Sequence, residues 1–154
     1  MKCILILNNI RSVLNVGAIF RTADCAGVEK IYLTGYTPAP VDRFGRKRAD
    51  FHKSALGAED SVLWEQCEDI AKLKHELGIM NYEWIALEQD IQAIDYGAYK
   101  PAKDFALIVG NETEGLPQEV LNICDKIIEI DMKGKKKSLN VSVALGVALF
   151  RLID

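Results

Sequence analysis

Short apolar runs rich in β-branched residues alternate along this chain with segments of helical periodicity. Strands that are buried on both faces of a parallel sheet have this composition, and helices form the crossover connections between them. The alternation therefore predicts an α/β fold with a mostly parallel sheet and helices on both faces. Six strands are expected: Cys3–Leu7, Lys30–Thr34, Ser61–Trp64, Glu83–Leu87, Phe105–Val109 and Ile127–Ile130.

Three of the connecting segments have helical patterns. A helix is predicted over Val16–Ala26, with Asn15 as its N-cap and Gly27 just past its end. Glu68–Leu77 is amphipathic, with its apolar residues on one face. Pro117–Cys124 begins with proline, which is favoured in the first turn of a helix.

The last predicted helix, Leu139–Ile153, has apolar residues on nearly every face. A helix of this kind has to be buried on all sides. At the end of a small domain, that requires either deep insertion or a partner subunit. We therefore expect a homodimer with this helix in or beside the interface.

The segment Gly35–Ala58 contains Pro38 and Pro40 and shows no clear periodicity. A connection of this length in a compact domain is usually functional or partly disordered. The formal net charge of −3 is not typical of a nucleic-acid binder, so any RNA contact has to come from local basic patches. Two such patches are present: Arg43, Arg46, Lys47, Arg48 and Lys53, and then Lys133, Lys135, Lys136 and Lys137.

Length and composition exclude several classes of protein. The 154 residues fit one domain, 1–154, that can bury a full core without disulfides or metals. The four cysteines form no C-x-x-C pair and have no histidine at ligand spacing, so no metal is expected. The N-terminal run lacks the features of a signal peptide, and no stretch is long enough to span a bilayer. We expect a cytoplasmic protein that does not contact membranes.

The first segment with candidate functional residues is 15–27, NVGAIFRTADCAG. Asn15 and Gly17 lie at a predicted helix N-terminus, where free N–H groups favour an anion and glycine lets a phosphate approach. Arg21 follows one turn after Gly17, and its guanidinium can bind a phosphate through two hydrogen bonds. Taken alone, a capped helix with a solvated arginine is the better interpretation.

The second segment is residues 105–117, FALIVGNETEGLP. A buried strand enters a turn with Gly110 and Gly115, and ligands of open parallel sheets bind at this end of the strands. The two glycines would let the backbone bend around a small molecule, and Asn111 and Glu112 supply polar groups. A plain strand-to-helix turn explains the same residues equally well.

The third segment is residues 128–146, in which a basic loop is followed by Ser138, Leu139 and Asn140 at the start of the buried helix. Either Ser138 or Asn140 could be the N-cap. The lysines could be solvated, or they could bind a polyanion. The G-x-G-x-x-G and G-x-x-x-x-G-K-[ST] motifs of nucleotide-binding domains are absent.

Taken in this order, the three segments resemble the SpoU/TrmH family of knotted SPOUT RNA methyltransferases, and the resemblance spans nearly the whole chain. The motif N-x-G-x-x-x-R is present at residues 15–21, G-N-E-x-x-G-L at 110–116, and S-L-N-V-S-V-A at 138–144. Leu14 and Asp131 stand where proline is frequent in the family.

The resemblance implies a deep C-terminal trefoil knot, an obligate dimer and S-adenosylmethionine bound in a bent form in the knot loops, with S-adenosylhomocysteine as product. It implies that Arg21 of one subunit meets the cofactor that the other holds, or meets it at their shared edge. The residues it assigns to the cofactor are Leu87, Glu88, Gly110, Asn111, Glu112, Gly115, Ile130, Met132, Ser138, Leu139 and Asn140.

The reaction implied is methylation of a ribose 2′-hydroxyl. A guanidinium keeps its proton, so we expect Arg21 to orient a phosphate and stabilise oxyanion charge, while a phosphate or water takes the proton. Asn15, Glu112, Ser138 and Asn140 are expected to position the ribose and Arg21. RNA-binding residues are expected to be Arg21, Arg43, Arg46, Lys47, Arg48, Lys53, Lys135 and Lys136.

The size of the chain resembles single-domain relatives that methylate the wobble ribose of tRNA, so tRNA is the expected substrate. An rRNA 2′-O-methyltransferase is the first alternative. A non-catalytic RNA-binding protein on the same fold is the second, and a flavodoxin-like nucleotide or regulatory domain is the third.

Overall fold

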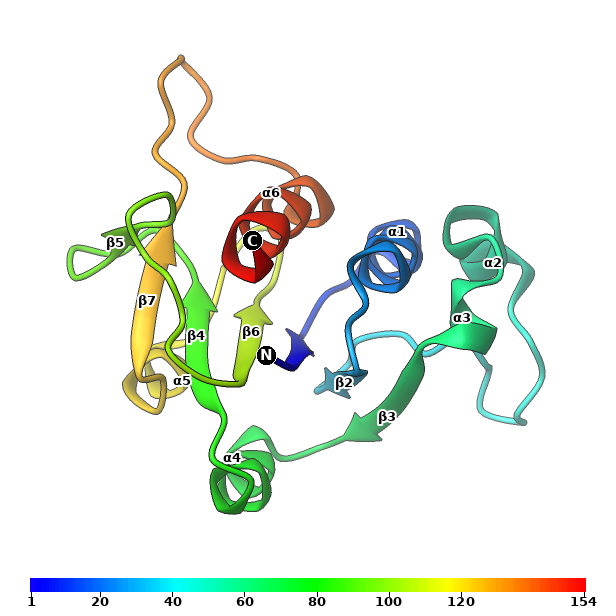
Figure 1. Cartoon of the computed structure of the whole chain (residues 1–154). Coiled ribbons are helices and arrows are strands. Elements are labelled where there is room, and N and C mark those ends of the chain that lie inside the picture. Colours follow the sequence, from blue (N-terminus) through cyan, green and yellow to red (C-terminus); the bar gives the residue numbers. More distant parts are fainter.

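The structure, a computed structural model, describes residues 1–154 apart from the side chain of Ile79 (Figure 1). A seven-stranded sheet forms its centre, with the strand order β3-β2-β1-β6-β4-β7-β5 and every pair parallel. The strands are β1 Cys3–Asn8, β2 Lys30–Thr34, β3 Leu63–Cys67, β4 Glu83–Leu87, β5 Ile94–Asp95, β6 Phe105–Val109 and β7 Lys126–Glu129.

Helices cover both faces of this sheet, as the sequence predicts. The first face carries α1, α2 and α6, and the second carries α4 and α5 (Figure 1). The helices are α1 Val13–Ala26, α2 Ala49–Ala55, α3 Ala58–Ser61, α4 Ile70–Ile79, α5 Gln118–Asn122 and α6 Val141–Ile153.

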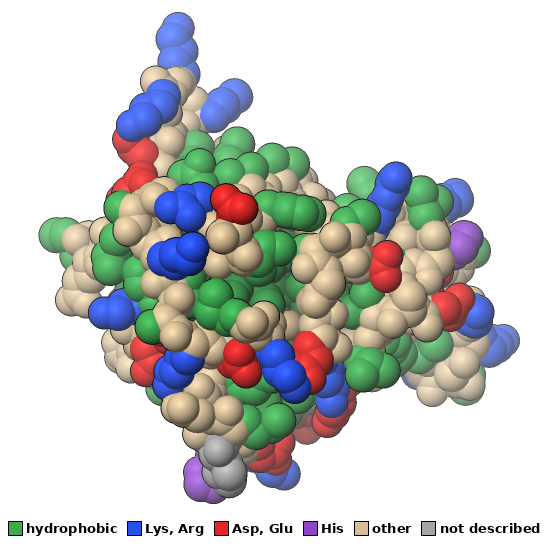
Figure 2. All heavy atoms as spheres, viewed as in Figure 1, with side chains coloured by type: hydrophobic (Ala, Val, Ile, Leu, Met, Phe, Trp, Pro, Cys, Tyr) green, Lys and Arg blue, Asp and Glu red, His purple; other side chains and the backbone are tan. Residues whose placement is uncertain are grey.

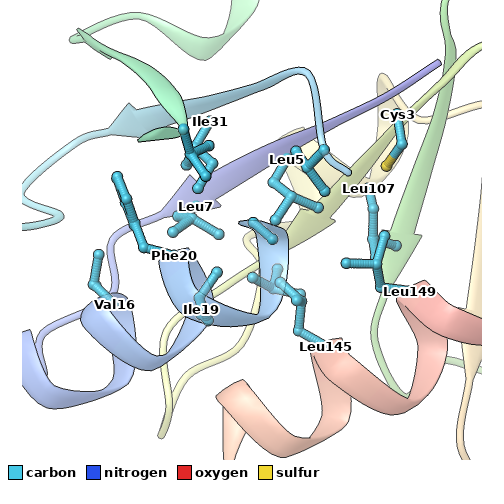
Figure 3. Packing of buried hydrophobic residues seen from close by; sticks show 14 of the residues in the cluster. Cys3, Leu5, Leu7, Val16, Ile19, Phe20, Ile31, Leu107, Leu145 and Leu149 are labelled. Carbon is cyan, nitrogen blue, oxygen red and sulfur yellow. The ribbon is translucent and has the colours of Figure 1, made fainter. Parts of the chain in front are cut away.

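The two central strands, β1 and β6, are buried along their whole length and divide their side chains between two cores. Leu5 and Leu7 point toward α1 and α6, whereas Ile4 and Ile6 point toward α4 and α5. This division follows from the alternation of side chains along a strand. Figure 3 shows the first core, where Leu5 and Leu7 meet residues of α1 and α6 such as Ile19.

The strand prediction needs several corrections. The first strand extends to Asn8 rather than Leu7, and the third to Cys67 rather than Trp64. The sheet has seven strands rather than six, because the two-residue strand β5 is too short to produce a pattern. The third strand begins at Leu63, since Ser61 ends α3 instead. The last strand runs from Lys126 to Glu129, so Ile130 lies outside it.

The segment predicted to lack periodic structure contains α2 and the start of α3. In α2, Phe51 and Ala55 are buried, and the rings of Phe51 and Phe20 meet edge-on with centroids 5.1 Å apart. A helix of seven residues has only two inward positions, so tertiary packing stabilises it without a detectable period.

Helix boundaries also differ from the prediction. Helix α1 begins at Val13, because the Ser12 hydroxyl caps it by accepting from the Asn15 N–H at 3.1 Å; Asn15 is in the first turn and is not the N-cap. Of the two candidates for the α6 cap, Asn140 is the residue that accepts from the Ser142 N–H, at 2.9 Å.

The other two helices are shifted by one or two residues. Helix α4 is capped by Asp69 and extends past Leu77 to Ile79. Helix α5 runs only from Gln118 to Asn122, and Pro117 is its N-cap rather than its first residue.

Helix α6 buries one face within this chain and exposes another. Leu145, Ala148, Leu149 and Leu152 are fully buried. Val143, Val147 and Phe150 are exposed by 52%, 41% and 48%. Within the described residues, no helix has the length and hydropathy needed to cross a bilayer.

Gly17 lies where α1 meets α2, and this contact leaves no room for a side chain. A Cβ there would lie 2.0 Å from the Ser54 hydroxyl oxygen and 2.8 Å from the Phe51 carbonyl oxygen. Gly17→Ala should lower the free energy of unfolding by about 1–3 kcal/mol, because α1 and α2 have to separate. Urea unfolding of both proteins measures this change.

Gly146→Ala is the matched control, since a Cβ there meets only Thr22, at an ordinary 3.6 Å. It should raise stability by roughly 0.5–1 kcal/mol through helix propensity. Equal effects of the two substitutions would contradict the packing account.

Candidate functional site

A cleft of about 640 Å³ opens at the carboxyl ends of β4, β6 and β7, beside the first residues of α1 and α6. Clefts of roughly 300–1,000 Å³ are typical of small-molecule sites. Every residue that the family resemblance assigns to the cofactor lines it: Leu87, Glu88, Gly110, Asn111, Glu112, Gly115, Ile130, Met132, Ser138, Leu139 and Asn140.

The turn from Gly110 to Gly115 forms one wall of the cleft. Gly115 has φ +69°, and its N–H donates to the Asn111 carbonyl at 2.9 Å. A Cβ on Gly110 would lie 2.7 Å from the Gly115 carbonyl, and one on Gly115 would lie 2.3 Å from a carboxylate oxygen of Glu88. Both glycines are therefore required by the fold of the turn itself.

Asn111 fixes this turn to its surroundings from a buried position. Its Oδ1 accepts from the N–H groups of Thr113 and Glu114, both at 2.9 Å. Its Nδ2 donates to the Asn9 carbonyl at 3.1 Å and to the Tyr36 hydroxyl at 2.7 Å. The turn is thereby joined to the loops that follow β1 and β2.

Glu88 lies at the end of β4 and supports the same turn. Its carboxylate accepts from the N–H groups of Leu116 at 2.9 Å and Gln89 at 3.0 Å. The neighbouring Gln89 donates from Nε2 to the Lys137 carbonyl at 2.7 Å. The loop after β4 therefore connects the glycine turn to the basic loop before α6.

A chain of hydrogen bonds joins the three segments that the sequence analysis singled out. The Asn15 Nδ2 donates to Glu112 at 3.3 Å, and the Asn140 Nδ2 donates to the Asn15 Oδ1 at 3.1 Å. The Glu112 carboxylate also accepts from the backbone N–H groups of Arg11 and Ser12, both at 3.2 Å. Ser138 lines the cleft beside this chain.

The environment of Glu112 changes its acidity. Burial raises the pKa of this carboxyl, but hydrogen bonds from its own N–H, from Arg11 and Ser12 and from the Asn15 amide outweigh burial, so its pKa lies below the usual value. A carboxylate thus occupies the N-terminus of α1, where a phosphate was expected. Gly17 also cannot receive a phosphate, because it packs against α2.

Arg21 is the one predicted catalytic residue that does not line the cleft. Its side chain is exposed and, within the described residues, forms no hydrogen bond or ion pair. It lies on the exposed face of α1 together with Leu14, seven residues earlier. A single copy of the chain therefore does not bring Arg21 to the other site residues.

The predicted RNA-binding residues lie outside the cleft. In the first patch, three of the five cations are already paired with carboxylates: Arg46 with Asp42, Lys47 with Asp60, and Arg48 with Asp50. The second patch occupies the exposed loop between β7 and α6, where basic side chains project from the body of the protein (Figure 2). There, Lys133 pairs with Asp131.

Comparison with known proteins identifies the family. The model of the SpoU rRNA Methylase family matches residues 2–150. The chain belongs to this family.

Two kinds of SpoU relative illustrate the match. The 23S rRNA (guanosine-2'-O-)-methyltransferase RlmB of Escherichia coli (strain K12) is 33% identical over 97% of this chain and 59% of its own length. The chain thus spans little more than half of the curated relatives that it matches. The A. aeolicus TrmH/SpoU tRNA modifying enzyme is 27% identical, with a TM-score of 0.84 over 97% of this chain and 73% of its own.

A second solved structure supports the fold alone. The AdoMet-bound rRNA methyltransferase from Sinorhizobium meliloti is 24% identical, with a TM-score of 0.83 over 97% of this chain and 55% of its own.

Several residues of the cleft were not predicted from the sequence. They include Gln89 and Glu129. Each lies within one residue of a predicted site residue or between two of them, so extending the motifs by their immediate neighbours would have found them. Tyr36 does not line the cleft but contacts Asn111, which does, and no sequence motif pointed to it.

The lowered pKa of Glu112 predicts a pH-dependent loss of stability in Glu112→Gln. A depressed pKa means that the ionised carboxyl stabilises the fold above the pKa of the unfolded chain, and that this stability is lost as pH falls through the folded-state pKa. At pH 7 the variant should melt about 1–2 °C lower than the wild type, a small shift because Glu112 is exposed and solvent screens its interactions. The difference should shrink as the pH is lowered.

Glu114→Gln is the control, because Glu114 is an exposed cleft carboxylate whose side chain has no hydrogen bond among the described residues. Its melting temperature should follow that of the wild type at every pH. A gap between wild type and Glu112→Gln that stays constant down to acid pH would contradict the assignment.

Proposed function

We propose that this chain transfers a methyl group from S-adenosylmethionine to a ribose 2′-hydroxyl of RNA. The observation that carries the proposal is the hydrogen-bonded chain Glu112–Asn15–Asn140, which joins all three SpoU motifs at the mouth of a ligand-sized cleft. The relatives support it, since RlmB is named a 23S rRNA (guanosine-2'-O-)-methyltransferase and the A. aeolicus protein a tRNA modifying enzyme.

The cleft fits S-adenosylmethionine in size and chemistry. Leu87, Ile130 and Leu139 offer apolar surface for an adenine ring. Glu114 and Glu129 add negative charge for a ligand that carries sulfonium and ammonium groups. When bound, the cofactor supplies an electrophilic methyl group.

The chain's own residues position the acceptor. Asn15 and Asn140 share one hydrogen bond and Glu112 accepts another from Asn15, so the three side chains line the cleft in a fixed arrangement. Glu112 is a weak base because its pKa is lowered, and it therefore positions Asn15 while a substrate phosphate or water takes the ribose proton. Arg21 orients the adjacent phosphate and stabilises the developing oxyanion.

A second copy of the chain is needed to bring Arg21 to this cleft. Leu14, Leu139, Val143, Val147 and Phe150 are exposed by 41–64% on the neighbouring helices α1 and α6 and just before α6. Apolar residues gathered in this way mark an interface. We propose that a homodimer forms here and places Arg21 of one protomer beside the cofactor of its partner.

The proposal includes the trefoil knot. The basic loop and α6 return past the segment between β4 and β6. Gln89 donates to the Lys137 carbonyl, and Arg151 donates to the Gly97 carbonyl at 2.6 Å. These contacts support a knot in which residues 130–140 pass through that segment.

The substrate class changes from the one first expected. The sequence analysis favoured tRNA, but curated relatives with 31–33% identity are named as 23S rRNA enzymes. We therefore propose rRNA as the substrate, with tRNA as the alternative that the A. aeolicus structure represents. Transfer of tritiated methyl to 23S rRNA and to total tRNA, followed by mapping of the modified ribose, distinguishes the two. No transfer to either would refute the function.

Arg21→Ala should reduce the rate of methyl transfer at least about 100-fold, since it removes phosphate orientation and oxyanion stabilisation. Its affinity for S-adenosylhomocysteine, measured by calorimetry, should stay within about twofold of wild type. Arg21→Lys keeps the charge but loses the two-bond geometry, so it should be intermediate. Equal loss of transfer and of cofactor affinity would refute this division of roles.

Val147→Asp should convert the dimer to a monomer, because it places a charge in the proposed apolar interface. Sedimentation at micromolar concentration measures the mass, and methyl transfer should be lost with the dimer. Ile91→Asp is the control, since Ile91 is fully exposed in the loop between β4 and β5, is not a residue of the proposed interface, and should leave the mass unchanged. A wild-type monomer at this concentration would overturn the dimer proposal.

A further inference from the structure

Tyr36 lies in the turn that follows β2, at the carboxyl edge of the sheet, and its aromatic ring is exposed to solvent. Its side chain is 54% exposed. Even so, both of its ends are fixed. Its backbone N–H donates to the Asn9 Oδ1 at 3.1 Å, and its hydroxyl accepts from the Asn111 Nδ2 at 2.7 Å.

The loop around Tyr36 is specifically shaped to hold this ring. Gly35 has φ +63°, and a Cβ there would lie 1.7 Å from the Asn9 Oδ1. Asn9 itself has φ +54°. On the other side, the buried Thr37 hydroxyl accepts from the Ile10 N–H at 3.1 Å and donates to the Leu7 carbonyl at 2.8 Å. The ring is therefore preorganised rather than loosely placed.

Tyr36 is also next to the cleft. Asn111, which its hydroxyl contacts, lines the cleft and belongs to the glycine turn. One hydrogen bond thus separates the exposed ring from the cleft wall. The base of a nucleotide whose ribose enters the cleft, or the base of a neighbour, would be within reach of a ring at this rim.

We propose that Tyr36 is a substrate-contacting residue whose ring stacks on an unpaired base of the RNA; this rests on the proposed function. Unstacked bases are commonly bound by aromatic side chains, and such stacking tolerates any base because each has a π-face. A rigid ring also loses little conformational entropy on binding. The substrate is therefore RNA with a single-stranded target, such as a loop or bulge, rather than a continuous duplex.

The test measures the affinity of the full chain for a fluorescein-labelled, unstructured 20-nucleotide RNA by anisotropy. Tyr36→Ala should raise Kd roughly 5- to 100-fold, which is the range for loss of one base–aromatic stack. Tyr36→Leu keeps an apolar side chain without a π-face and should lose most of the same affinity. Tyr36→Phe keeps the ring and should stay within about twofold of wild type.

Two controls separate stacking from a structural role. Leu63→Ala removes a side chain with 66% exposure at the amino end of β3 and should not change RNA affinity. Affinity for S-adenosylhomocysteine should be the same in Tyr36→Ala, Tyr36→Leu and Tyr36→Phe, because all three lose the same hydrogen bond to Asn111. A further test uses an RNA that the wild type methylates, with an abasic site placed at the target nucleotide or at either of its neighbours. At one of these positions the abasic site should lower the RNA affinity of the wild type. The RNA affinity of Tyr36→Ala should not change at that position.

Wild-type affinity in Tyr36→Ala would overturn the inference. So would a loss in Tyr36→Phe as large as that in Tyr36→Ala, because it would assign the effect to the hydrogen bond with Asn111. Failure of this inference can be told apart from failure of the proposed function, because the proposed function fails only if the wild type methylates no RNA. The anisotropy experiment measures RNA affinity whether or not the wild type methylates RNA.

Discussion

The carboxylate of Glu112 is the interaction on which the arrangement of the site depends. It accepts from two backbone N–H groups just before α1 and from Asn15, which in turn accepts from Asn140 at the cap of α6. One charged group thus joins the turn after β6 to the beginnings of two helices. A favourable charge near a helix N-terminus stabilises this arrangement.

Because of this arrangement, the N-terminus of α1 is not available to bind a phosphate of the substrate. The N-terminus of α1 is occupied by the chain's own anion, and Gly17 is covered by α2. Recognition of a phosphate therefore falls to exposed groups such as Arg21, which a single copy leaves outside the cleft. The proposed homodimer would account both for the apolar surface of α1 and α6 and for the position of Arg21 outside the cleft.

The sequence was informative where local pattern and structure coincide. The apolar runs of β1 and β6 predicted the centre of the sheet, and the three ordered motifs predicted the lining of the cleft. It was uninformative where tertiary contacts decide the structure. Helix α2 exists because Phe51 packs on Phe20, and β5 is only two residues long. Tyr36 becomes relevant only because folding brings it to Asn111.

The most direct test of the account is a crystal structure of the full chain with S-adenosylhomocysteine. The account predicts a bent ligand between the Gly110–Gly115 turn and residues 130–140, with Arg21 of the partner protomer beside it. It also predicts that the Glu112–Asn15–Asn140 chain stays intact. A ligand bound elsewhere, or a cleft completed without a second protomer, would contradict the central claim.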